Sequence, residues 1–142
     1  MSAPLYNRDI LALAVAVGDH PRLAVAQVSG ERRAPLCGSR VGLDLDLAAD
    51  GTVTQVGMAV EACALGQAAA ALFARGAAGR TATELRAADA ALRAWLAGAS
   101  ETAPEWPGIA ILAPARAYPA RHGAIQLPFA LAAQLTGAEV SA

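Results

Sequence analysis

The chain contains no lysine and has few cysteine, histidine and aromatic residues. All eleven basic residues are arginine, which excludes any mechanism that needs a lysine amine. Two cysteines in 142 residues do not make a disulfide framework, because disulfide-stapled domains carry several pairs in a shorter chain. The net charge is −1 and there is no basic stripe, so we expect no nucleic-acid partner.

Long hydrophobic runs are also absent. The longest uncharged apolar run, residues 62–74, is too short to span a bilayer and is typical of a buried helix. Residues 10–17 could be mistaken for a signal-peptide core, but Asp9 stands directly before them and no clear basic region precedes them. We therefore expect a soluble, cytoplasmic protein with no membrane partner, in which thiols stay reduced.

The sequence is instead rich in small apolar residues. Hydrophobic residues make up 56% of it, above the usual range of about 45–50%, and alanine supplies about one residue in four. Alanine is the best helix former, so much of the chain should be helical. The length, with no linker and no internal repeat, predicts one domain over residues 1–142.

The first part of the chain predicts a helix followed by strands. Residues 5–17 predict a helix with Asn7 as its cap and Gly18 at its end, and residues 23–30 predict a strand.

Residues 41–60 predict a hairpin around the Asp-Gly turn at 50–51, with a bulge near Thr54 or Gln55. Apolar residues alternate with Asp44 and Asp46, so we expect these two aspartates on a solvent-exposed face of the strand.

The second part of the chain predicts helices over 63–79, 81–98 and 121–136. Thr81 and Glu84 form a capping-box pattern, and Pro128 either kinks the last helix or begins it afresh. Residues 99–119 predict a loop, with Trp95 and Trp106 as core or loop anchors. Strands followed by helices predict an α+β fold: a three-stranded antiparallel sheet with helices packed on one face.

The two cysteines flank the predicted hairpin. Cys37 lies in the loop that enters it, and Cys63 follows its exit, at the start of an apolar helix whose N-terminus would stabilise a thiolate. Because a hairpin brings its entry and exit together, the thiols should be neighbours. They could share a metal, form a disulfide or simply be close, and a free cysteine commonly acts as a small buried hydrophobe.

Five motifs in order give the chain a family resemblance. Together they span residues 6–136 and resemble the IscU/SufU/NifU-type iron–sulfur cluster assembly scaffolds. They are HPR (20–22), PLCGSRVGLDLDL (35–47), ACALGQAAAALF (62–73), GRTATEL (79–85) and YPARHGAIQLPFALAAQL (118–135).

The resemblance implies a SufE/NifU-like α+β fold with a metal site at one end of the sheet. The ligand positions it implies are Cys37, Ser39, Cys63 and His122. Ser39 stands where the family has an aspartate. Gly123 stands where the family has its third cysteine.

These departures limit the metal chemistry that the resemblance allows. A [2Fe–2S] cluster usually takes four protein ligands, so a four-cysteine cage is excluded. A zinc or iron site of Cys37, Cys63 and His122 with one open position is compatible with the sequence. Arg40 and Arg121 flank the site, either as stabilisers of thiolates or as solvated charges. Arg80 replaces the lysine of the family's Gly-Lys motif.

The resemblance implies a function and leaves two alternatives. The implied function is a non-enzymatic scaffold that binds iron, zinc or a labile iron–sulfur cluster through Cys37 and Cys63. Its partners would be a cysteine desulfurase and cluster-acceptor proteins. One alternative is a degenerate homologue that acts as a protein-interaction or regulatory module without a cluster. The other is a sulfur-transfer protein with Cys63 as the nucleophile.

Overall fold

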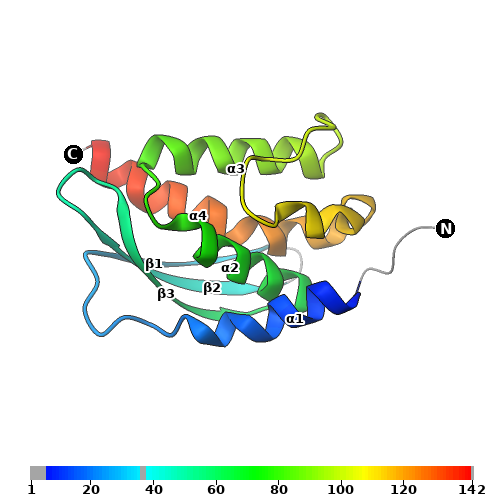
Figure 1. Cartoon of the computed structure of the whole chain (residues 1–142), viewed down its shortest axis with the longest axis horizontal. Coiled ribbons are helices and arrows are strands. Elements are labelled where there is room, and N and C mark those ends of the chain that lie inside the picture. Colours follow the sequence, from blue (N-terminus) through cyan, green and yellow to red (C-terminus); the bar gives the residue numbers. More distant parts are fainter. Residues whose placement is uncertain (1–5, 36–37, 142) are drawn as a thin grey trace.

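The computed structural model describes residues 6–35 and 38–141, and it confirms the predicted α+β fold. In the view of Figure 1, α2, α3 and α4 lie above the three-stranded sheet, and α1 runs along its lower edge. The elements in chain order are α1 (Arg8–Ala16), the 3₁₀ helix η1 (Val17–Asp19), β1 (Val28–Arg33), β2 (Arg40–Leu47), β3 (Val53–Glu61), α2 (Ala64–Ala77), α3 (Ala82–Leu96), the 3₁₀ helices η2 (Ile109–Ala117) and η3 (Pro119–Arg121), and α4 (His122–Ser141).

The hairpin of β2 and β3 forms as predicted. The sheet order is β1-β2-β3, and both pairs of strands are antiparallel. Gly51 takes a φ of +87° in the turn, which glycine adopts without strain. Asp46 pairs with Gln55, and the next residue, Leu47, pairs with Val53. Thr54 is therefore the extra residue of the predicted bulge.

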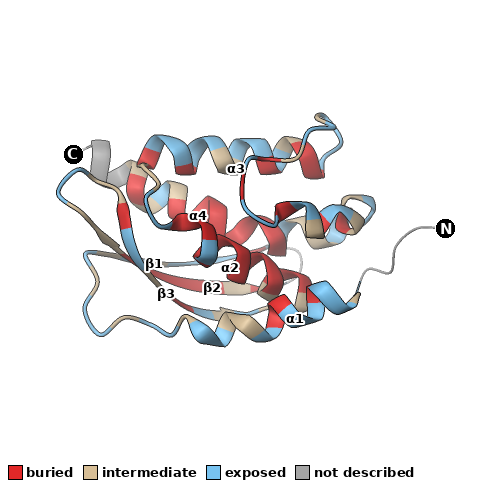
Figure 2. Ribbon diagram, viewed as in Figure 1, coloured by how far each residue is buried: buried red, intermediate tan, exposed pale blue. Residues whose placement is uncertain are grey.

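The core lies between the sheet and the helices. Val41, Leu43 and Leu45 of β2 are buried, and α2 and α4 pack over this face. Because α2 contacts α1, α4 and β3, it is buried along most of its length, as Figure 2 shows. Its many alanines let the neighbouring elements approach closely.

The connection between α1 and β1 differs from the prediction. Asn7 caps α1 as expected, and its Oδ1 accepts a hydrogen bond from the Ile10 N–H at 3.0 Å. The strand predicted at 23–30 begins only at Val28. Residues 20–23 instead cross the sheet face opposite the helices, and we call them the strap.

The strap also overturns the predicted solvent exposure of Asp44, which is only 3% exposed. It covers this aspartate because Arg22 and the Leu23 N–H both bind the carboxylate. Asp46 keeps partial exposure and accepts a hydrogen bond from the Gln27 N–H.

The segment predicted as a loop, residues 99–119, contains η2 and leads directly into η3. Trp106 anchors it as expected: its Nε1 donates to the Leu72 carbonyl at 2.8 Å, and its ring stacks on Phe73 and meets Phe129 edge-on. Trp95 is buried too, so both tryptophan predictions are confirmed.

The flanking helices follow their sequence signals closely. The capping box of Thr81 and Glu84 opens α3, and Gly98 follows its end with a φ of +81°. The last helix, α4, runs on to Ser141 with Pro128 inside it. Across the described ranges, no helix has the length and apolar character needed to cross a bilayer.

Candidate functional site

Three segments meet at the open end of the hairpin: the loop before β2, the start of α2 and the start of α4 (Figure 1). Arg40 pairs with Glu61, so the residues just before one and just after the other lie at the same end of the sheet. The loop is closed by two backbone hydrogen bonds, from the Ala34 N–H to the Ser39 carbonyl and from the Gly38 N–H to the Ala34 carbonyl. Cys37 lies outside the described residues.

Cys63 is the N-cap residue of α2, and its thiol is free and half-buried. Its side chain makes no capping hydrogen bond to the helix. Gln67 fixes the entry to this helix, because its Nε2 donates to the Ala62 carbonyl at 3.0 Å and its N–H donates to the Cys63 carbonyl. The sulfur therefore sits at a defined helix start, where backbone N–H groups favour a bound anion.

The first turn of α2 packs directly on the start of α4. A methyl group placed on Gly66 would lie 3.2 Å from the Cβ of Ala124, and Ala124 itself is 1% exposed. A methyl group on Gly123 would instead lie 3.5 Å from the Cβ of Ala34. Ala124 thus faces the cysteine-bearing helix, whereas Gly123, to which the sequence assigned the missing third cysteine, faces the loop before β2.

His122 is half-buried at the start of α4, and its ring is held by η2. Its Nε2 lies 2.9 Å from the Ala115 carbonyl oxygen. Because a carbonyl only accepts hydrogen bonds, Nε2 is the donor, and in the neutral ring the lone pair then lies on Nδ1. His122 also lines a hollow together with Leu96 at the end of α3 and Ala97 just beyond it. Within residues 6–35 and 38–141, no group of three or more His, Cys, Asp or Glu side chains could hold a metal ion.

The other predicted site residues have local structural roles. Ser39 is 6% exposed, and its carbonyl closes the loop before β2. Arg40 binds Glu61 at 2.5 Å and lies 3.7 Å from Glu31, and the hydrogen bond that Arg40 donates to Glu61 raises the pKa of the guanidinium. Arg121 is half-buried at the end of η3.

Sequence reasoning missed an ionic cluster beneath the sheet. Arg22 forms a forked pair with Asp44, with Nε–Oδ2 and Nη2–Oδ1 distances of 2.7 and 2.8 Å, and Ser29 donates to the same carboxylate. The Arg22 hydrogen bond lowers the pKa of Asp44 to about 2, although burial opposes the shift. Hydrogen bonds from Ser29 and the Leu23 N–H add to the lowering.

Two glycines inside the strands could have indicated this cluster from the sequence alone. A side chain on Gly42 would meet the Arg22 guanidinium, and one on Gly57 would lie 2.5 Å from the Pro21 carbonyl oxygen. Glycine inside a strand often marks a close backbone approach. Gly42 and Gly57 lie on the same sheet face as Asp44. The absence of side chains at these two positions leaves room on that face for the HPR motif.

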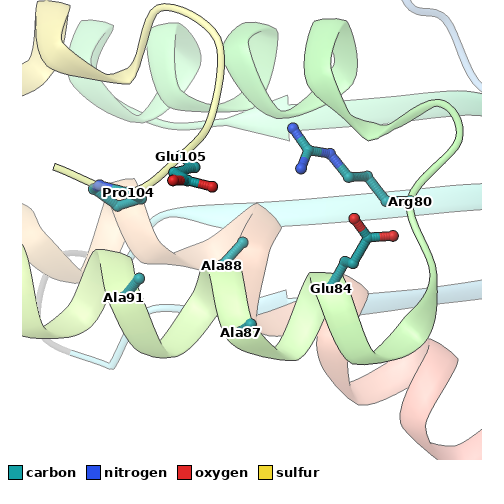
Figure 3. Close-up of a pocket in the computed structure, with 7 residues that line it drawn as sticks. All are labelled: Arg80, Glu84, Ala87, Ala88, Ala91, Pro104 and Glu105. Carbon is teal, nitrogen blue, oxygen red and sulfur yellow. The ribbon is translucent and has the colours of Figure 1, made fainter.

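A separate hollow of about 280 Å³ lies between α3 and the segment that follows it (Figure 3). Arg80, Glu84 and Glu105 line it with three alanines and a proline. The Arg80 Nε donates to the Gly76 carbonyl at 2.9 Å, and its guanidinium stacks 4.4 Å from the centre of the Trp106 ring. These contacts give Arg80 a packing role.

Comparison with known proteins defines the family. No family model matches the chain, and no curated protein matches it. Among solved structures, the N-terminal domain of a nitrogen-fixing NifU-like protein from Brucella abortus is 36% identical, covers 97% of this chain and 96% of its own, and superposes with a TM-score of 0.86.

A second structure shows the same fold. It is a protein described as an iron–sulfur cluster assembly scaffold for the SUF system of Fervidobacterium islandicum AW-1. It is 18% identical over 93% of this chain and 96% of its own, with a TM-score of 0.81. The identity to the NifU-like domain over nearly the whole length, together with the shared fold, shows that this chain belongs to the IscU/SufU/NifU-type scaffold family.

Proposed function

We propose that this protein is a scaffold or carrier in iron–sulfur cluster assembly and not an enzyme. Its cargo would be iron, zinc or a labile cluster, held through Cys37 and Cys63. The observation that carries the proposal is family membership together with the position of Cys63: a half-buried free thiol at the start of α2, where two other segments converge.

The donor set fits a labile cargo better than a permanently bound cluster. The chain has only two cysteines, and a [2Fe–2S] cluster usually needs four ligands. Cys37, Cys63 and the Nδ1 of His122 would supply three and leave a position for a ligand from a partner. The hydrogen bond from His122 Nε2 to Ala115 supports this assignment, because ligating histidines commonly donate their other N–H to a carbonyl.

Ser39 contributes less to this set. Its hydroxyl is a poor ligand unless deprotonated, and the residue is buried in a closed loop. Arg40 is already paired with Glu61, so Arg121 is the better candidate for stabilising bound thiolates.

The partners that fit this function are a cysteine desulfurase, which supplies sulfur, and proteins that accept the assembled cluster. The SufU-type relative is described as a scaffold of a cluster assembly system, which supports this class of partner. Neither a membrane nor a nucleic acid has a role in the proposal.

The test is anaerobic reconstitution with ferrous iron, cysteine and a cysteine desulfurase. We expect visible sulfur-to-iron charge-transfer absorption, bound iron on analysis and transfer of the cluster to an acceptor apoprotein. A protein that stays colourless and metal-free, and takes no sulfur from the desulfurase, would contradict the proposal.

Specific observations favour two other functions. Ser39 and Gly123 replace a carboxylate and a thiolate, which favours a module that keeps the family's partner surface without cargo. This reading predicts that a Cys37→Ala, Cys63→Ala double variant leaves the cellular phenotype unchanged.

The position of Cys63 favours sulfur relay, which predicts a persulfide on Cys63 in mass spectra but no bound iron.

A further inference from the structure

A groove lined by arginines lies beside the loop that carries Cys37. It has a volume of about 200 Å³ and runs between the edge strand β1, α4 and α3. Arg32 and Arg33 of β1 and Arg93 of α3 line it. Its lining includes Pro35, next to the undescribed pair 36–37, and no carboxylate. We call it the arginine groove.

The two β1 arginines of the arginine groove are not neutralised by a neighbour. The guanidinium of Arg33 makes no hydrogen bond or ion pair in the part of the chain that the structure describes. Arg32 donates from Nη1 to Gln134 Oε1 at 2.8 Å, and this partner carries no charge. Arg22 and Arg40, in contrast, bind carboxylates. The groove therefore concentrates positive charge in a chain whose net charge is −1.

Arg93 adds a third, partly engaged cation. Its side chain is 62% exposed, and one nitrogen, Nη2, lies 3.3 Å from the Asp89 carboxylate. Asp89 also accepts a hydrogen bond from Gln126 at 2.5 Å, which draws the carboxylate toward α4. A guanidinium has five N–H donors, so Arg93 keeps donors for a ligand.

The shape of the arginine groove suits a peptide chain. Gly123, Ala34 and Ala130 leave room for a backbone to approach, and the lining includes no aromatic ring. Gly123 and Arg93 also line the hollow that contains His122, so the arginine groove adjoins the start of α4. A segment bound here would lie beside two of the three segments that form the candidate site.

We infer that the arginine groove docks an acidic segment of a partner protein, rich in Asp and Glu side chains. Guanidinium forks match carboxylates in geometry and charge, and the pairing steers association. Single-stranded nucleic acid fits less well, because its binding sites combine basic residues with aromatic platforms. The identity of the partner, as a protein that delivers or receives cargo, rests on the proposed function; the docking itself needs no metal.

The test measures fluorescence anisotropy of a labelled Glu-rich peptide with the metal-free full chain. Its Gln-substituted version and a single-stranded oligonucleotide serve as competing probes. We expect the Glu-rich peptide alone to bind, with affinity that falls as salt rises. Arg32→Glu with Arg33→Glu should weaken binding about tenfold or more, and Arg93→Gln should weaken it less.

The matched control is Arg8→Glu with Arg86→Glu, an equal change of net charge at two exposed arginines outside the arginine groove. This pair should keep peptide affinity within about twofold of wild type, because it changes the net charge of the protein but no residue that lines the arginine groove. Circular dichroism melting checks that both variants fold. Equal losses in the two pairs, no binding by wild type, or tighter binding of the oligonucleotide would each overturn the inference.

Because the assay uses metal-free protein, its result does not depend on cluster reconstitution. Failure to reconstitute a cluster would reject the scaffold proposal and leave the peptide result standing. Absence of peptide binding would reject the arginine groove as a docking site and leave the scaffold proposal standing.

Discussion

At the scale of single residues, Asp44 is a buried carboxylate held by the Arg22 guanidinium, the Ser29 hydroxyl and the Leu23 N–H. The alternation along β2 correctly separates its two faces, but a polar face can meet solvent or another part of the chain. The residue that covers Asp44 is Arg22, 22 positions earlier. Only tertiary structure makes that pairing, although the two strand glycines beside Asp44 hinted that a segment crosses there.

We predict that Asp44→Asn lowers stability by about 2 kcal/mol at neutral pH, because it breaks the forked pair around a buried carboxylate and leaves the half-exposed Arg22 without its counter-ion. Chemical denaturation at neutral pH measures the loss. Asp46→Asn, at a half-exposed position with one weaker hydrogen bond, is the matched control and should cost less. Equal effects of the two substitutions would contradict the structural role of the cluster.

The same cluster predicts an acid dependence. The folded pKa of Asp44, about 2, is below the unfolded value of about 3.9. A lowered pKa stabilises the fold above the unfolded value, and this contribution disappears as pH falls through the folded value. Wild type should therefore lose stability between about pH 4 and pH 2, and Asp44→Asn should lose less over that range. Parallel stability curves for the two proteins would refute this prediction.

At the scale of elements, the segment between α3 and α4 was the largest error in the sequence reading. Its proline and alanine content favours a loop, yet the segment holds η2 and packs against the core. The buried residues Trp106, Ile109, Leu112 and Ala115 recur every three positions. That spacing matches the three-residue turn of a 3₁₀ helix, a period that is easily overlooked beside those of α-helices and strands.

Trp106 and Gly76 should be coupled in stability. Trp106→Ala should cost about 3–5 kcal/mol, because it removes a buried ring and its hydrogen bond to Leu72. Gly76→Ala should cost about 1–3 kcal/mol, because the added methyl group meets the Trp106 ring. In the Trp106→Ala background the second change should cost much less. Denaturant titrations of the four proteins give the coupling.

Gly18→Ala is the control for this cycle, since no atom lies within 4 Å of the added methyl group. It should change stability little and should do so equally in both backgrounds. Full additivity of the Gly76 and Trp106 substitutions would show that the ring does not occupy the space beside Gly76.

The start of α4 gives a second prediction at this scale. Ala124 faces the first turn of α2, whereas Gly123 faces Ala34. The third cysteine of the family would have to face α2, the helix whose N-cap residue is Cys63, in order to share a bound metal with that cysteine. We therefore expect Ala124→Cys to retain more iron and sulfide after reconstitution than Gly123→Cys. Iron and sulfide analysis after gel filtration measures the difference. Greater retention by Gly123→Cys would place the missing ligand at the position that the family resemblance implies.

At the scale of the whole molecule, the sequence predicts where in the fold the candidate site lies better than it predicts which side chains face one another there. The hairpin pattern places its entry and exit at one end, and the structure has the flanking residues Arg40 and Glu61 paired there. The helix caps at Asn7 and Thr81 are also readable from local chemistry.

The direction of each side chain at the start of α4 was not readable. Successive residues of an α-helix point about 100° apart, so Gly123 and Ala124 face different neighbours. The predicted start at Arg121 differs from the observed start at His122 by one residue. Which residue faces α2 is decided by the contact between Gly66 and Ala124, 58 positions apart, and the Ala115 carbonyl in η2 orients His122.

The most direct test of the central claim, that Cys63 binds the cargo, is iron K-edge X-ray absorption on anaerobically iron-loaded protein. Wild type should show sulfur scattering from thiolate ligands, and Cys63→Ala should lose part of this sulfur shell together with bound iron. Ser100→Ala, far from the hairpin end in sequence, should match wild type. Iron bound by wild type with only oxygen and nitrogen neighbours, or an unchanged sulfur shell in Cys63→Ala, would contradict the account.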